Sequence, residues 1–131
     1  MLNVKEEIEL LVKAPNEPGI LGRVLGTLAN VGVNLKGLQA MSLNKTGLFR
    51  LITSDPQKAE KALKSMGYDV TKNKVITVLI EDRIGAGAEI GALLGNAVID
   101  ILYCYGTSAG KGNVLIVLKT TDNKKALKTL K

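Results

Sequence analysis

The N-terminal part of the chain changes from a strand pattern to a helix pattern at one polar turn. Apolar Ile8, Leu10 and Val12 occupy alternate positions, which predicts a strand over residues 6–13. After the turn, apolar residues recur at helical spacing, which predicts a helix over residues 20–30. Gly32 is expected to end this helix, because glycine adopts the left-handed conformation freely.

Two strands joined by a short turn are predicted next. Alternation predicts a strand over residues 33–43, and residues 48–53 form the following one. Between them, residues 44–47 are typical of a hairpin turn. We expect Gly47 to take the positive φ that short hairpin turns require.

A second helix is predicted after Asp55, which can cap its N-terminus, with Pro56 in the first turn. The helix should end at Gly67, and residues 68–70 begin a fourth strand. The order is therefore strand, helix, strand, strand, helix, strand. This order is typical of a ferredoxin-like α+β fold, with an antiparallel sheet and both helices on one face.

The same series returns about 66 residues later, which predicts two tandem βαββαβ modules over residues 1–72 and 73–131. Residues 81–85 take the place of the first polar turn. The second module is truncated, because its fourth strand is missing. We expect a borrowed strand, a partner chain or an exposed edge there, and we favour pairing because an exposed apolar edge promotes aggregation.

The composition indicates a small protein with an aliphatic core. Of the 131 residues, 46% are hydrophobic but only 3% are aromatic. The formal net charge is +6, with both signs interspersed. Lysines gather only near the C-terminus, at Lys124, Lys125, Lys128 and Lys131. Such a run is usually a solvated helix face, so nucleic acid is not a favoured partner.

Several functional classes are excluded by what the sequence lacks. The chain has no histidine, which excludes histidine-based catalysis and the usual zinc sites. Cys104 is the only cysteine, which rules out an intramolecular disulfide and fits a reducing cytoplasm. Neither a signal peptide nor an apolar run of ~20 residues is found. We therefore expect a cytoplasmic protein that is not an enzyme and has no metal, cofactor or membrane partner.

The turn after the first strand is the best candidate for a binding site. Pro18 suits the first turn of a helix, and Gly19 allows close approach to the backbone. Free N–H groups at a helix start attract an anion such as a carboxylate or phosphate. In the alternative interpretation, Asn16 and Gly19 only shape the turn.

The most informative segments of the repeat are Val12–Leu21, the helix to Asn30, Gly32–Leu35 and Gly67–Val70. With these segments, the repeated unit resembles the ACT domain family. The resemblance covers nearly the whole chain. The second copy matches weakly, because Ile84 replaces the proline of the turn and Val98 replaces the glycine before the second strand.

The resemblance implies a regulatory module that binds a small ligand, most often an amino acid, at an interface between modules or chains. In amino-acid-sensing members, the turn after the first strand and the start of the second strand hold the ligand. Asn16 and Asn34 match the asparagines of those two places, and their amides can recognise an α-amino and α-carboxyl pair. The implied ligand-binding residues of the first copy are Asn16, Glu17, Pro18, Gly19, Ile20, Leu21, Asn34 and Leu35.

The second copy carries Asp82 and Asp100 at the two equivalent positions. An anionic corner favours an ammonium group or a cation over a carboxylate. The alternative is a degenerate site with solvated carboxylates. The first copy is therefore the favoured amino-acid site.

Three functional classes remain open. The favoured one is a tandem ACT protein that binds an amino acid and passes that state to its own homodimer or higher homo-oligomer, or to a metabolic enzyme. A narrower version is a regulatory subunit of an amino-acid biosynthetic enzyme such as acetolactate synthase, whose ACT turn looks similar. RNA binding on a ferredoxin-like sheet requires stacking aromatics, and the third strand offers one, Phe49. Catalysis is least favoured, since only Asp82 and Asp100 could form a carboxylate pair.

Overall fold

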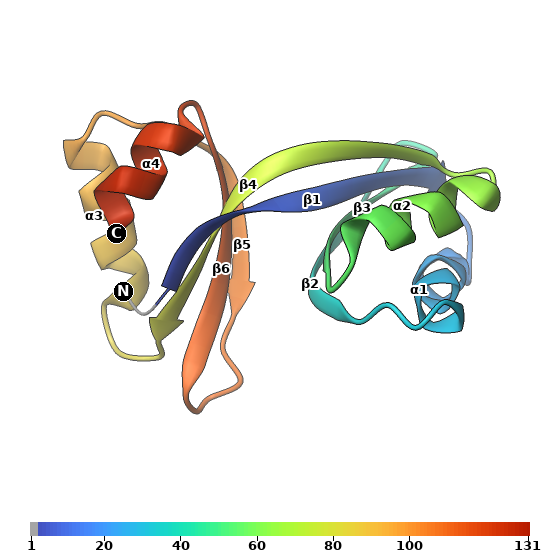
Figure 1. The fold of residues 1–131 in the computed structure, drawn as a ribbon, viewed down its shortest axis with the longest axis horizontal. Helices are drawn as coiled ribbons and strands as arrows, with labels where there is room; N and C mark the ends of the chain where they lie inside the picture. Colours follow the sequence, from blue (N-terminus) through green and yellow to red (C-terminus); the bar gives the residue numbers. More distant parts are fainter. Residues whose placement is uncertain (1–2) are drawn as a thin grey trace. The chain divides into compact units, whose positions relative to one another are not determined.

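A computed structural model describes residues 3–131 of the chain (Figure 1). These residues form two compact units. The first unit is Ile8–Asn73, and the second is Lys74–Lys131 together with the described residues up to Glu7. The elements of the described part are β1 (Asn3–Pro15), α1 (Ile20–Asn30), β2 (Leu35–Leu43), β3 (Thr46–Thr53), α2 (Pro56–Ser65), β4 (Asp69–Glu81), α3 (Ala86–Asn96), β5 (Ile101–Thr107), β6 (Asn113–Thr120) and α4 (Asn123–Leu130).

The first unit is a four-stranded sheet in the order β2-β3-β1-β4, with two helices on one face. β3 runs antiparallel to both β1 and β2, and Leu10 lies opposite Leu51. The apolar sides of α1 and α2 cover this face of the sheet and form one core with it. The predicted ferredoxin-like arrangement is therefore confirmed. The helix residues at the centre of this core are Val24, Leu28, Ala59 and Leu63.

The second unit repeats this arrangement with a strand from the opposite end of the chain. Its sheet order is β1-β4-β6-β5, and the part of β1 before Ile8 is the fourth strand. Val4 is only 7% exposed and lies in the same core as Ile76 and Leu118. Of the three alternatives for the missing strand, the structure therefore has the borrowed one. Residues 3–7 belong with the second unit, although their sequence continues into the first.

Two helices begin with a side-chain cap and two do not. Asp55 and Asp122 accept hydrogen bonds from backbone N–H groups in the first turns of α2 and α4, at 3.1 and 3.0 Å. The predicted Asp55 cap is thus confirmed, and its repeat equivalent caps α4. By contrast, α1 and α3 begin after Gly19 and Gly85, and no side chain caps either helix.

Two turn predictions were wrong. Pro18, expected in the first turn of α1, lies in the turn before it, because the helix begins at Ile20. Gly47, expected to take a positive φ, is buried in β3, where an added Cβ would lie 3.0 Å from the ring of Phe49. The positive φ of this hairpin, 58°, belongs to Asn44. Asparagine tolerates the left-handed region because its short polar side chain can bond locally.

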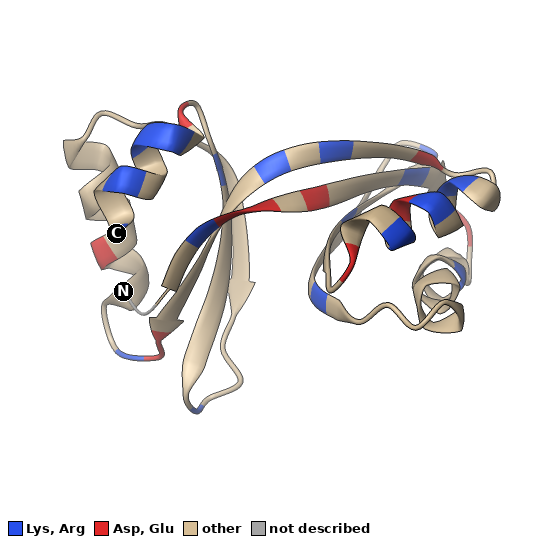
Figure 2. Cartoon of the chain, viewed as in Figure 1, with Lys and Arg blue, Asp and Glu red and all other residues tan. Residues whose placement is uncertain are grey.

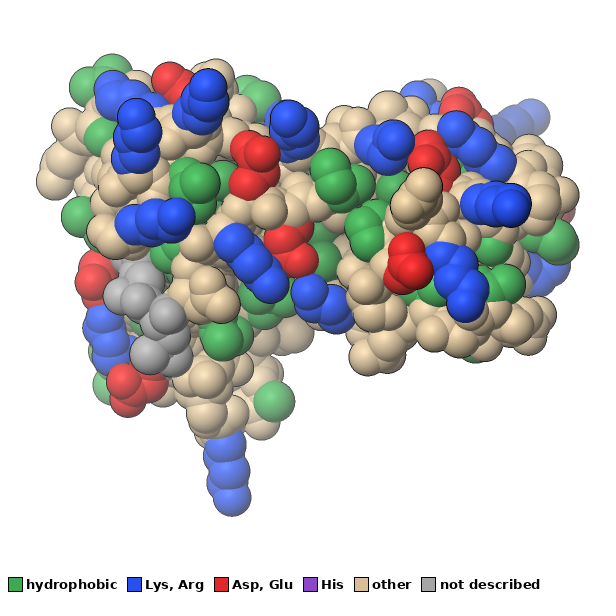
Figure 3. Space-filling view, in the orientation of Figure 1, with side chains coloured by type: hydrophobic (Ala, Val, Ile, Leu, Met, Phe, Trp, Pro, Cys, Tyr) green, Lys and Arg blue, Asp and Glu red, His purple; other side chains and the backbone are tan. Residues whose placement is uncertain are grey.

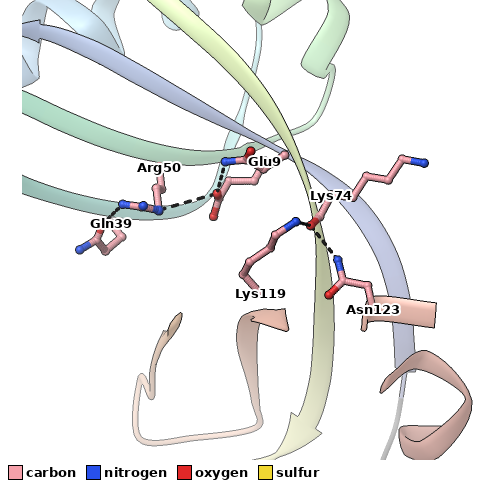
Figure 4. A network of polar contacts seen from close by, with 7 residues as sticks. Glu9, Gln39, Arg50, Lys74, Lys119 and Asn123 are labelled. Carbon is pink, nitrogen blue, oxygen red and sulfur yellow. Dashed lines mark hydrogen bonds and ion pairs between the residues drawn. The ribbon is translucent and has the colours of Figure 1, made fainter. Parts of the chain in front are cut away.

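The sheet of the first unit carries a buried ion pair on the face away from its helices (Figure 4). Glu9 is fully buried, and its Oε1 lies 3.8 Å from Nε of Arg50 and accepts a bond from Asn73 at 3.4 Å. Arg50 also donates to Gln39 at 3.4 Å. In the second unit the positions equivalent to Glu9 and Arg50 hold two buried valines, Val75 and Val117.

Candidate functional site

The first corner, residues 16–21, joins β1 to α1 through a type II turn. The N–H of Ile20 donates to the carbonyl of Glu17 at 3.2 Å. Gly19 has φ 88° and ψ −5°, which the third residue of such a turn requires and which favours glycine. The N–H of Asn16 donates to the carbonyl of Lys45 at 2.8 Å, so the β2–β3 loop holds the corner in place.

The second corner, residues 82–87, has the same backbone. The N–H of Ala86 donates to the carbonyl of Arg83 at 3.2 Å, and Gly85 has φ 86° and ψ −1°. The N–H of Asp82 donates at 2.8 Å to a carbonyl of the β5–β6 loop. Ile84 stands where the first corner has its proline, and its side chain is fully exposed. The turn therefore forms without proline, and the glycine is the residue that both corners retain.

Both corners leave the start of a helix open to a ligand. The N–H groups of the first turn have no acceptor inside the helix, and here no side chain caps them. Together with the helix dipole they favour an anion. The N–H of Ile20, one of the implied ligand-binding residues, is engaged within the turn. The donors that follow it in α1 belong to Leu21 and Gly22.

The two corners carry the same ion pair in opposite orientation. Nη2 of Arg23 contacts Oε1 of Glu17 at the first corner, and Nη2 of Arg83 contacts Oε2 of Glu89 at the second. Arg83 and Glu89 stand 66 positions after Glu17 and Arg23, so the two signs are exchanged at equivalent positions. The guanidinium of Arg23 lies beside its turn, because an added Cβ on Gly19 would be 3.3 Å from Nη1.

The exchange gives the corners different electrostatics. Glu89 lies in the first turn of α3, where its own carboxylate complements the helix dipole. Asp82 adds a second carboxylate, which accepts a hydrogen bond from Ser108 in the β5–β6 loop. The first corner therefore suits a carboxylate, and the second disfavours one. The sequence analysis missed both Arg23 and Glu89, although aligning the two repeats position by position would have revealed the exchange.

Asn34 and Asp100 lie at the far ends of α1 and α3 from the corners. The backbone of Asn34 exchanges two hydrogen bonds with Ser54, each 2.9 Å long. Asp100 makes the equivalent pair after β6. The eleven residues of α1 correspond to about 16 Å between the first corner and Asn34. The structure therefore does not bring Asn16 and Asn34 together within one unit, nor Asp82 and Asp100.

The remaining predicted site residues divide into exposed and core positions. Glu17, Pro18 and Leu21 are exposed at the first corner. The side chain of Ile20 is buried in the core of the first unit, and Leu35 packs against the same core. Ile20 therefore supports the first corner from within the core, whereas Leu35 lies next to Asn34, at the other end of α1. The other exposed candidates are Asn16, Gly19, Asn34 and Asp100.

Other parts of the described surface give less support for a binding site. Phe49, the ring considered for RNA stacking, is 4% exposed and belongs to the core of the first unit. Basic and acidic positions are spread over both units (Figure 2), and the face in view in Figure 3 mixes the two signs. Within residues 3–131, no cluster of three His, Cys, Asp or Glu side chains could hold a metal ion. The helices of this part of the chain are too short or too polar to cross a membrane.

The comparisons with known structures agree with this fold. Protein BT0572 from Bacteroides thetaiotaomicron has 27% sequence identity and a TM-score of 0.89, and the match covers 97% of this chain and 88% of that one. The aspartate kinase regulatory subunit of Thermus thermophilus, in its ligand-free form, has a TM-score of 0.70 at 14% identity, with 97% and 93% covered. The corresponding subunit of Thermus flavus has a TM-score of 0.63 at 16% identity, with 97% and 94% covered.

The comparison with sequence families decides the assignment. No curated protein matches the chain. A family model described as an ACT domain pair matches residues 7–130, which include both corners and nearly all of both units. The resemblance seen in the two repeats is thereby confirmed. The chain belongs to the ACT domain pair family.

Proposed function

We propose that this ACT domain pair is a non-catalytic regulatory protein that binds an α-amino acid at its first corner. The observation that carries the proposal is the uncapped start of α1 with the Arg23–Glu17 ion pair beside it. An α-amino acid is a zwitterion and needs a cation and an anion side by side. The first corner offers both, next to free backbone donors.

The contacts of the ligand follow from these groups. Its carboxylate takes the N–H groups of Leu21 and Gly22 and the guanidinium of Arg23. Its ammonium group takes the carboxylate of Glu17 and the side-chain oxygen of Asn16. The ligand carboxylate thus takes the place of Glu17 beside Arg23, and the ligand ammonium group takes the place of Arg23 beside Glu17. The second corner, with Glu89 and Asp82, binds no carboxylate in this proposal.

A second copy of the chain completes the site. Family resemblance implies an asparagine from the start of a second strand, but Asn34 lies about 16 Å from the first corner of its own unit. We therefore propose that the protein is a homodimer or a higher homo-oligomer, in which a partner contributes this residue. Ligand binding then shifts the balance between assembled and separate copies by the difference in affinity for the two states.

The regulated partner is proposed from the structural neighbours. Two of them are regulatory subunits of aspartate kinase by name, which supports a metabolic enzyme as the partner. A regulatory subunit of acetolactate synthase is the alternative within the same class. RNA binding loses its support because Phe49 is buried. The single cysteine, Cys104, is compatible with a cytoplasmic location.

Thermal unfolding in the presence of each proteinogenic amino acid tests the proposal. A ligand that binds only the folded state raises the melting temperature, and saturation at 100 times the Kd adds about 2.7 kcal/mol. We expect at least one amino acid to do so at millimolar concentration. Arg23→Gln should abolish the shift, whereas Arg83→Gln, which breaks the matching ion pair at the second corner, should retain it.

Two outcomes contradict the proposal. If no amino acid shifts the melting temperature of the unmodified protein, the ligand class is wrong. If Arg23→Gln and Arg83→Gln lose the response equally, the first corner is not the site.

A further inference from the structure

Each corner is the end of a strand that begins in the other unit. β1 begins with residues 3–7 in the second unit and ends at the first corner. β4 begins with residues 69–73 in the first unit and ends at the second corner. Both strands have 13 residues. Figure 1 shows that each runs without a break. The chain therefore links each corner to the fourth strand of the opposite unit without an intervening loop.

The segment of β1 before Ile8 is built into the second unit. Val4 is buried in that core, beside Ile76. The hydroxyl of Thr77 donates to Oε2 of Glu7 at 2.6 Å. Loss of this segment would open both the core and one edge of the four-stranded sheet.

The first segment of β4 is built into the first unit in the same way. Val70 is 8% exposed and belongs to the core of that unit. Asn73 donates to the buried carboxylate of Glu9 at 3.4 Å. Each unit therefore depends on a segment whose other end is a corner.

We propose that β1 and β4 couple the two units reciprocally, so that a change in the backbone of one corner alters the stability of the fourth strand in the opposite unit. The residues of a paired strand open together more readily than one by one, because each opened residue exposes its neighbour's bonds. Coupling between two sites must act equally in both directions. This coupling involves no ligand, so it does not depend on whether the first corner binds an amino acid.

Amide hydrogen exchange of the full chain tests this coupling. Gly19→Ala forces a residue with a Cβ into φ 88° in the turn that follows β1, and it should loosen the first corner. We expect the amides of residues 4–7, in the other unit, to exchange about fivefold faster. Gly32→Ala is the matched control, because it strains φ 73° at the opposite end of α1 before β2, a strand confined to the first unit.

The control decides between coupling through β1 and general weakening. At equal loss of melting temperature, Gly32→Ala should leave residues 4–7 unchanged. Equal acceleration by both variants overturns the route through β1. Acceleration confined to the first unit in Gly19→Ala overturns the coupling altogether.

The reciprocal variant keeps the test decisive if Gly19→Ala fails to fold. Gly85→Ala strains φ 86° at the end of β4, and an added Cβ there meets no other atom within 4 Å. We expect faster exchange at residues 69–73 of the first unit. Gly110→Ala, at φ 89° in the β5–β6 loop, is its control and should leave those amides unchanged. Unchanged exchange at residues 69–73 in Gly85→Ala contradicts coupling through β4.

Discussion

The two corners share one backbone conformation, but the two charges of their ion pairs stand at exchanged positions. Gly19 and Gly85 take nearly the same φ and ψ, and each precedes an uncapped helix. Glu17 and Arg23 at the first corner become Arg83 and Glu89 at the second. A glycine and one hydrogen bond therefore determine the shape of both corners, whereas two exposed side chains determine where the positive and negative charges lie on it.

The sheets of the two units differ more strongly than their corners, on the face away from the helices. The sheet of the first unit buries Glu9 with Arg50, and that of the second unit has Val75 and Val117 at the same places. A buried ion pair contributes little net stability against a well-packed apolar pair, but breaking it leaves a costly group behind.

The buried ion pair gives the largest expected effect. Arg50→Val should lower the free energy of unfolding by about 3 kcal/mol, because the guanidinium 3.8 Å from the buried Glu9 is lost. The double variant Glu9→Val with Arg50→Val copies the second unit and should recover most of that loss. Urea denaturation measures both. A double variant that is as unstable as the single one would show that the pair is not the cause.

A substitution two residues after the first helix of each unit should have an intermediate effect on the free energy of unfolding. Gly32 has φ 73°, whereas Val98 at the equivalent position has φ 58° and is 89% exposed. A β-branched residue is strained in the left-handed region, so Val98→Gly should raise the free energy of unfolding by about 1 kcal/mol. Thermal and urea unfolding report the change.

The reverse exchange serves as the control for this position. Gly32→Val should lower the stability of the protein by a similar amount, since it places the same strain at the end of α1. If Val98→Gly destabilises the protein, the exposed valine makes a contact that outweighs its strain.

The smallest expected effect is on the pH dependence of stability. It comes from Glu60 of α2, which has no acidic counterpart in α4. Its hydrogen bond with Lys64 at 3.1 Å, helped by Lys72, holds the pKa of the Glu60 carboxyl below its ordinary value of 4.5. A depressed pKa stabilises the folded state above the unfolded-state pKa, and this stability is lost as the pH falls through the folded pKa. Melting temperature measured from neutral pH to below 4.5 should therefore fall less steeply for Glu60→Gln. Glu6→Gln in β1 is the matched control, and an identical change in both variants contradicts the assignment.

The local elements could be predicted from the sequence because their signals are local. The apolar repeat from Leu21 to Leu28 identified α1 with its observed bounds, and Asp55 marked the start of α2. The 66-residue repeat then gave the second unit. Long-range strand pairing has no such signal. The sequence predicts residues 3–7 as part of the first unit, and only the open edge of the second sheet indicates that they pair there.

The candidate site was predictable only in part. Asn16 and Gly19 were proposed from the turn, whereas Arg23 was not, because its place beside the turn depends on a side chain folding back over it. The distance between Asn16 and Asn34 also escaped the sequence, since α1 places them at its two ends. When the residues of a site come from different elements, only coordinates, often including those of a second chain, show that they lie close together.

Reversing the charge pair of one corner at a time decides which corner binds the amino acid. The readout is thermal unfolding with the amino acid that shifts the melting temperature of the unmodified protein most. We expect Glu17→Arg with Arg23→Glu to abolish the shift and Arg83→Glu with Glu89→Arg to keep it. A shift that survives reversal of the first corner, or that is lost on reversal of the second alone, contradicts binding at the first corner.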